Sequence, residues 1–153
     1  MTLTIGIVGL GLIGGSMGLD WRDRGHRVLG VSRRPETIER AIERGACDQA
    51  SCELDLLKSA DVVVLCTPLG VMTATIDHLL PHLADGAILT DAGSVKAPIV
   101  AAIAPRYPNF VGGHPMAGTA DSGIEAALRG LFVDRPYVCL LYTSPSPRDR
   151  TRS

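Results

Sequence analysis

The feature that most constrains this chain is a glycine-rich turn within residues 4–16. The apolar residues 5–8 predict a short parallel strand that is covered on both faces. Gly9, Gly11 and Gly14 follow it with G-x-G-x-x-G spacing. In such a corner the first glycine allows a tight turn, the second lets the backbone approach a pyrophosphate, and the third lets the helix pack closely on the strand. A strand, this turn and a helix in immediate succession predict a dinucleotide-binding site rather than a purely structural turn.

The helix after this turn is expected over residues 12–24, with Gly25 as its C-terminal cap. Its first residues, Leu12 and Ile13, would bring backbone N–H groups and the positive end of the helix dipole to the phosphates. Gly18 extends the closely packed face of the helix by one further turn. The candidate pyrophosphate-binding residues are therefore Gly9, Gly11, Leu12, Ile13 and Gly14.

Strand-like and helix-like segments alternate along the rest of the chain, which predicts a mainly parallel sheet with helices on both faces. We expect a Rossmann-type, doubly wound α/β domain over residues 1–141. In such sheets, ligands bind beyond the carboxyl ends of the strands. The expected strands are 5–8, 27–31, 61–66, 87–90, 110–111 and 137–141, and the expected helices are 12–24, 35–44, 54–59, 71–80, 95–104 and 123–129, with a polar connection over 48–53.

The end of the second expected strand indicates which nicotinamide cofactor fits. An NAD site has a carboxylate at this point for the ribose hydroxyls, whereas this chain has Ser32 followed by Arg33 and Arg34. A small hydroxyl leaves room for a 2'-phosphate, and an arginine can pair with that phosphate. We therefore favour NADP over NAD. The alternatives are that both arginines are merely solvated, and that Glu36, the nearest acid, complements the start of the helix behind Pro35.

His114 is the candidate catalytic residue. Two glycines precede it and a proline follows it, so we expect it in a loop rather than in a regular element. A neutral imidazole can accept a hydroxyl proton while hydride leaves for the nicotinamide. Ser94 could orient the same hydroxyl, although a role as the cap of the helix expected over 95–104 is equally consistent with the sequence.

Composition and charge exclude several classes of protein. The net charge of −1 argues against a general nucleic-acid or membrane-surface role. The chain has no leader-like start and no run of 18 apolar residues, so we expect a cytoplasmic protein with no membrane partner. His78 and His82 stand four apart, but Pro81 would interrupt their helix, so no metal is expected. Buried thiols are expected for the cysteines, which are Cys47, Cys52, Cys66 and Cys139.

Four blocks of this chain resemble, in order and spacing, the prephenate/arogenate dehydrogenase family of tyrosine biosynthesis. The histidine-centred block is the specific one, because the glycine turn is shared across dehydrogenases. The match extends to about Leu141, and Ser32-Arg33 with Phe132-Val133 is most similar to the NADP-dependent arogenate dehydrogenases of the cyanobacterial type. The four blocks are residues 9–16, 66–68, 91–96 and 112–119.

The resemblance implies an oxidative decarboxylation of arogenate or prephenate. Hydride would leave the ring carbon that carries the hydroxyl, His114 would take the hydroxyl proton, and Ser94 would hydrogen-bond the same oxygen. The ring would then lose its carboxylate as carbon dioxide and become aromatic. Thr67 and Pro68 would lie against the nicotinamide end of the cofactor. The resemblance assigns no role to Lys96.

Two departures from the family bear on function. The resemblance implies a second, helical domain, which in the family forms the dimer and supplies an arginine to the substrate carboxylate, and we expect that domain to be missing from the 153 residues given. Residues 142–153 are instead rich in Ser, Pro and Arg, and we expect a disordered, non-native tail. We therefore expect this fragment to be inactive alone, and the groups that separate arogenate from prephenate to lie in the missing part. A 3-hydroxyacid dehydrogenase and a non-catalytic NADP-binding module are the alternatives.

Overall fold

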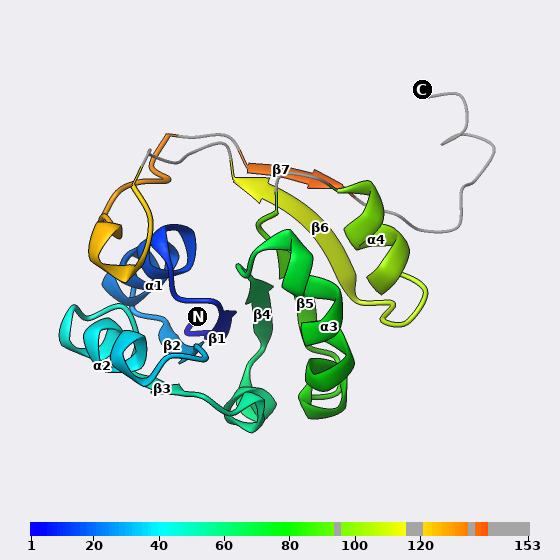
Figure 1. Cartoon of the computed structure of the whole chain (residues 1–153), viewed down its shortest axis with the longest axis horizontal. Coiled ribbons are helices and arrows are strands. Elements are labelled where there is room, and N and C mark those ends of the chain that lie inside the picture. The colour runs from blue at the N-terminus through cyan, green and yellow to red at the C-terminus, as the bar shows by residue number, and fades with distance from the viewer. Residues whose placement is uncertain (94–95, 116–120, 135–136, 141–153) are drawn as a thin grey trace.

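The fold is a twisted sheet between two layers of helices, as the computed structural model shows (Figure 1). The structure describes residues 1–93, 96–115, 121–134 and 137–140. Strands and helices alternate along the chain, as the sequence predicts. In chain order the strands are β1 Thr4–Val8, β2 Arg27–Val31, β3 Gln49–Ser51, β4 Val62–Leu65, β5 Ile88–Asp91, β6 Phe110–Pro115 and β7 Tyr137–Leu140.

The strand order within the described sheet is β3-β2-β1-β4-β5-β6-β7. Neighbouring strands run parallel from β3 to β6, and β7 pairs antiparallel with β6. The order from β3 to β6 is that of dinucleotide-binding folds, in which the chain reverses its direction of winding beside β1. Beyond the carboxyl ends of β1 and β4, this reversal opens a crevice between the two connections. The predicted doubly wound, mainly parallel fold is confirmed.

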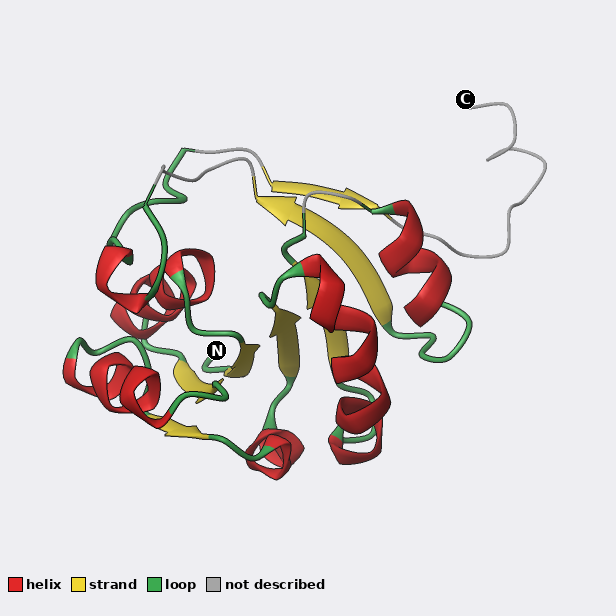
Figure 2. Ribbon diagram, viewed as in Figure 1, coloured by secondary structure: helices red, strands yellow, loops and turns green. Residues whose placement is uncertain are grey.

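Helices cover both faces of the sheet (Figure 2). Helices α1 (Leu12–Asp23) and α2 (Pro35–Glu43) lie on one face, and α3 (Leu69–Leu79) and α4 (Ala97–Ile103) lie on the other. Because the strands from β3 to β6 run parallel, the connections that follow them all start at the carboxyl edge of the sheet. Shorter 3-10 turns are η1 Leu54–Ser59, η2 Leu80–His82 and η3 Ile124–Ala126.

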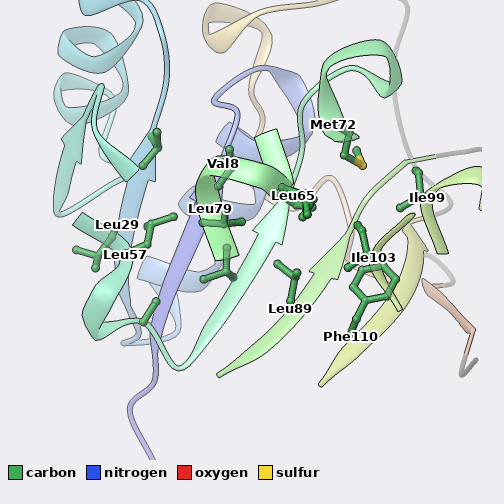
Figure 3. Packing of buried hydrophobic residues seen from close by; sticks show 14 of the residues in the cluster. Val8, Leu29, Leu57, Leu65, Met72, Leu79, Leu89, Ile99, Ile103 and Phe110 are labelled. Atoms are coloured by element: carbon green, nitrogen blue, oxygen red, sulfur yellow. The ribbon is translucent and has the colours of Figure 1, made fainter. Parts of the chain in front are cut away.

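Apolar side chains of the central strands alternate between two cores. Val63 and Leu65 of β4 belong to the core beneath α3 and α4, whereas Val64 belongs to the core beneath α1 and α2. This alternation is the period of two that a strand imposes on its side chains. Figure 3 shows the first core, where Met72 and Ile99 from the helices pack near strand residues such as Leu65. A strand buried on both faces explains the continuous apolar run at residues 62–65.

The structure confirms several predicted helix boundaries. Helix α2 starts at Pro35, with Glu36 in its first turn, and Gly25 and Gly45 after the first two helices have positive φ values of 88° and 80°. Positive φ is the conformation that ends a helix and that glycine adopts without strain. Helix α3 ends at Leu79, before the Pro81 that the sequence indicates as an interruption.

The structure corrects the sequence prediction in four places. The polar connection over 48–53 contains edge strand β3, because its backbone pairs with β2 although its side chains are polar. The helix expected over 123–129 is only the 3-10 turn η3. Helix α4 begins at Ala97 with Lys96 at its N-cap, two residues later than the helix start expected at residue 95, and Ser94 lies outside the described residues. His114 is not in a loop but in β6, which continues to Pro115 because β7 pairs with its far end.

No helix in the described part of the chain is long and apolar enough to cross a membrane.

We predict that Gly18→Ala destabilises the domain. A Cβ at this position would lie 2.2 Å from the carbonyl oxygen of Ala46, so α1 would have to move away from the segment after α2. In an open helix the change from glycine to alanine would raise the free energy of unfolding by about 1 kcal/mol. Overpacking costs about 1–3 kcal/mol, so we expect the contact with Ala46 to make the net change destabilising. Urea unfolding followed by circular dichroism measures the effect.

Gly11→Ala is the matched control, because no atom in the described part of the chain lies within 4 Å of a Cβ built there. We expect it to unfold at the midpoint of the parent chain. Equal midpoints for both variants would show that α1 does not need this close contact.

Candidate functional site

The glycine turn lies at the carboxyl edge of the sheet, between β1 and β4. The N–H of Gly9 donates to the carbonyl of Val31 at 2.9 Å, and Gly9 has a φ of 103°. A Cβ on Gly9 would lie 2.8 Å from the backbone of Cys66, and one on Gly14 would lie 2.0 Å from the carbonyl oxygen of Gly9. Both positions exclude a side chain, so the close turn and the close helix predicted for them are confirmed.

The N-terminus of α1 is open on the side where a pyrophosphate would bind. Gly11 occupies the N-cap, and no side chain caps the helix or places an acidic group in its first turn. The backbone N–H groups of the first turn, which include those of Leu12 and Ile13, have no acceptor within the helix. With no atom of the described residues within 4 Å of a Cβ on Gly11, this position has room for a ligand. The space, the N–H groups and the helix dipole together fit a bound phosphate.

A segment distant in sequence covers the other face of α1. A Cβ on Gly15 would lie 2.8 Å from Ile124 and 2.9 Å from Ala127, and the buried Ser16 hydroxyl accepts the N–H of Leu128 at 2.9 Å. This covering strap comprises residues 124–130. Sequence reasoning missed it, although a second glycine directly after Gly14 was a signal that something packs there.

Arginine side chains tie the strap to α2. Arg40 donates to both carboxylate oxygens of Glu125, at 2.6 and 2.8 Å, and Arg44 donates to the carbonyl of Ile124 at 2.6 Å. Hydrogen bonding to Arg40 lowers the pKa of Glu125. The strap therefore lies across α1 and α2, the two helices that flank β1 and β2.

The end of β2 carries the predicted ribose-binding residues. The hydroxyl of Ser32 accepts the N–H of Arg34 at 3.3 Å, which bends the chain directly before α2. Arg33 and Arg34 are exposed, and neither side chain has a partner among the described residues. The cationic groups are thus available to an anion near Ser32.

The end of β4 lies against the glycine turn. Thr67 follows this strand, and its hydroxyl oxygen is buried with no hydrogen-bond partner in the described part of the chain. Pro68 is the N-cap of α3. Burial, and secondarily the charge of Asp91, raise the pKa of the Cys66 thiol to about 12, so this thiol stays protonated and is not a nucleophile at neutral pH.

The ends of β5 and β6 are joined by the buried carboxylate of Asp91. One of its oxygens accepts the N–H of Gly113 at 3.1 Å, and the other accepts the N–H of Gly93 at 3.0 Å and pairs with the ammonium of Lys96. His114, the next residue after Gly113, is half-buried. Its Nδ1 atom is buried and, within the described residues, has no hydrogen-bond partner.

The fold thus gathers most of the predicted residues at one edge of the sheet. In Figure 1 the arrowheads of β4 and β6 point to the same side of the molecule. Buried polar atoms are nearly always hydrogen-bonded, so the two exceptions in the described residues, on Thr67 and His114, are candidates for contact with a ligand. Among the described residues, no three His, Cys, Asp or Glu side chains lie close enough to hold a metal ion.

Comparison with known proteins gives consistent results. Residues 17–145 match the family described as "Prephenate dehydrogenase, nucleotide-binding domain". The chain is 37% identical to the prephenate dehydrogenase of Lactococcus lactis, and the match covers 86% of this chain. The structure of Synechocystis arogenate dehydrogenase is 44% identical, with a TM-score of 0.90 over 98% of this chain. The prephenate dehydrogenase from A. aeolicus, in complex with hydroxyphenyl propionate and NAD+, is 29% identical, with a TM-score of 0.86.

The chain spans only part of these relatives. It covers 39% of the Lactococcus protein and 54% of the Synechocystis chain.

We predict that Gly11→Ala weakens dinucleotide binding without lowering stability. The added methyl would occupy the open space at the helix N-terminus where a pyrophosphate approaches the backbone. We expect the Kd for NADP to rise about tenfold or more, equivalent to about 1.4 kcal/mol, as measured by fluorescence titration of the chain. Gly18→Ala, assayed below its unfolding transition, is the control and should bind normally. If Gly11→Ala bound like the parent chain, the pyrophosphate would have to lie elsewhere.

Proposed function

The chain belongs to the prephenate dehydrogenase family, as its nucleotide-binding domain, and we propose that it forms the cofactor half of an NADP-dependent dehydrogenase that oxidatively decarboxylates arogenate or prephenate. The observation that carries this proposal is the pair of buried, unpartnered polar atoms on Thr67 and His114, on the same edge of the sheet as the open glycine turn. Family membership favours this reaction over the oxidation of a 3-hydroxyacid.

The cofactor would lie across the carboxyl edge of the sheet. Its pyrophosphate would bind at Gly11 and the first turn of α1, and its nicotinamide end would reach Thr67 and Pro68 after β4. The unpartnered hydroxyl of Thr67 can donate a hydrogen bond to a carboxamide there. When bound, the nicotinamide supplies the hydride acceptor for the reaction.

The adenosine ribose would lie at the end of β2. The exposed guanidinium groups of Arg33 and Arg34 support NADP, because each can pair with a 2'-phosphate and no described acidic side chain engages either of them. Ser32 occupies the position at which an NAD site would have a carboxylate. Its hydroxyl accepts the N–H of Arg34. Both features favour NADP over NAD.

The chemistry assigns one proton transfer to His114. Neutral imidazole would accept the proton of the ring hydroxyl while hydride leaves the ring carbon that carries this hydroxyl. Ser94 would hydrogen-bond the hydroxyl oxygen. Breaking the bond to the ring carboxylate releases carbon dioxide, and its electron pair makes the ring aromatic. The phenolic oxygen then takes a proton back from the imidazolium. The product is tyrosine from arogenate, or 4-hydroxyphenylpyruvate from prephenate.

The substrate site would need a second wall. We propose that the part of the longer relatives that this chain does not cover corresponds to a helical domain, which supplies cations for the substrate carboxylates and forms a homodimer. Without that wall, the orientation that can contribute about 7–11 kcal/mol to the barrier is not achieved, so the 153-residue chain alone should bind NADP weakly and have no turnover. Residues 142–153 lie outside the described residues, and we propose that they form a disordered, non-native tail. We also propose that the enzyme is cytoplasmic.

We predict that Arg33→Ala weakens NADP binding about ten- to a hundredfold and leaves NAD nearly unchanged. The reason is the loss of a charge-assisted hydrogen bond, worth about 1.5–3 kcal/mol. Ser32→Asp should reverse the preference. Titration of each variant with both cofactors measures this. Arg106→Ala removes the same charge at an exposed pair with Asp77 and should change neither affinity. Equal losses for NAD and NADP in Arg33→Ala would disprove the assignment of the 2'-phosphate.

We predict that His114→Asn lowers turnover by about two to four orders of magnitude, the usual contribution of a general base. The experiment uses a fusion of residues 1–140 to the C-terminal part of Synechocystis arogenate dehydrogenase, with NADPH formation followed at saturating arogenate. NADP affinity should persist.

His78→Asn is the matched control, because His78 is exposed on α3 away from the site, and we expect full turnover. Near-normal turnover of the His114→Asn fusion would place the proton acceptor elsewhere. An unmodified fusion that turned over neither arogenate nor prephenate would contradict the proposed reaction itself.

A further inference from the structure

We propose that Asp91 is a positioning residue for His114, and that Lys96 is its counter-ion. Asp91 would hold the His114 imidazole in place, and the effect of this on catalysis rests on the proposed function. It gives a role to two residues of the 91–96 block that neither the family match nor the sequence assigns.

The backbone ladder between β5 and β6 stops before both strands end, which leaves a gap between them. The two strands pair only at Leu89 with Phe110 and at Thr90 with Val111. Beyond this point β6 continues, pairing with β7 at its other edge through residues 112–115. The Asp91 carboxylate bonds to the N–H of Gly113 across the gap, so a side chain replaces the backbone ladder one residue before His114.

The carboxylate is held in place by groups from both sides of the gap. Asp91 has no solvent exposure, and its second oxygen accepts the N–H of Gly93 and pairs with Lys96, whose side chain is 9% exposed. A buried charge is tolerated only when it is paired and hydrogen-bonded. The Lys96 ammonium therefore lets a full negative charge remain beneath the site.

Tight packing leaves this arrangement little freedom. A Cβ on Gly93 would lie 2.9 Å from Ile99 and 3.1 Å from the Asp91 carboxylate, so the chain turns closely around the carboxylate. Gly113 and Pro115, on either side of His114, are buried. By fixing the backbone at Gly113, the carboxylate restricts where the His114 imidazole lies, and the Nδ1 of that ring has no hydrogen-bond partner among the described residues. Such restriction matters because an error of about 1 Å in the position of a reacting group can cost ~10²-fold in rate.

Two variants test the Asp91 carboxylate, one by removing its charge and the other by moving its position. Asp91→Asn removes the charge at nearly constant shape, and Asp91→Glu keeps the charge but moves the carboxylate by one methylene. The first readout is the set of His114 ring signals in ¹H–¹⁵N spectra of the chain as given, assigned by their loss in His114→Asn. We expect both variants to shift or broaden these signals. The ring of His26, which accepts the N–H of Leu3 at the opposite edge, is the internal reference and should not change.

Asp61→Asn is the matched control variant. Asp61 also accepts a strand N–H through its side chain, from Thr4 at 2.8 Å, but at the amino edge of the sheet. We expect this variant to leave the His114 signals unchanged.

The second readout is kinetic and uses the fusion with the Synechocystis C-terminal part. Both Asp91 variants should lower kcat about 10- to 100-fold and change the KM for NADP less than about twofold, a split that a general loss of stability would not produce. If Asp91→Asn fails to fold, Asp91→Asn combined with Lys96→Met, which removes both buried charges, replaces it in both readouts.

Unchanged His114 signals and an unchanged kcat in a folded Asp91 variant would overturn the inference. The proposed function can fail separately: if the His114→Asn fusion keeps its turnover, His114 is not the proton acceptor. The spectra would then still decide whether Asp91 holds its ring.

Discussion

The structure depends on one close approach, the seating of α1 against the end of β1. The carbonyl of Gly9 lies where a side chain on Gly14 would be, so the helix can start immediately after the strand and point its open N-terminus across the sheet edge. A bulkier residue at Gly14 would lift the helix and remove its N–H groups from the crevice beside β4. The geometry of the glycine turn is thus a consequence of backbone packing, since Gly9, Gly11 and Gly14 contribute no side-chain atoms.

Sequence reasoning reached the fold because the strongest signals were local. The apolar strands, Pro35 at a helix start and the glycines at 25 and 45 each fix a boundary within a few residues, and alternation then fixes the topology. Strand β3 was missed because an edge strand has polar side chains, and its identity lies in backbone pairing with β2 that no pattern reports. The fold could therefore be predicted nearly whole.

The site could be predicted only as a set of residues. The glycines around His114 suggested a loop, yet the same glycines lie in a strand, because β7 arrives from later in the chain to pair with it. Lys96 likewise had no role in the sequence, since its partner Asp91 becomes buried only when β5 and β6 come together. Both errors arise from long-range contacts. A side chain on a strand is held more firmly than one on a loop, and here β7 pairs with one edge of β6 while the Asp91 carboxylate bonds to the other.

The strap over α1 and α2 has a consequence for the order in which the chain can fold during synthesis. Contacts such as Ser16 with Leu128 and Arg40 with Glu125 join parts of the chain separated by 112 and 85 residues. Until the ribosome has released the segment beyond residue 124, Gly15 and its surroundings have no cover, although β1, α1 and β2 have already emerged. Contacts of such large sequence separation form late and slowly. The packing around α1 is therefore completed late, although α1 is the first helix of the chain to be synthesised.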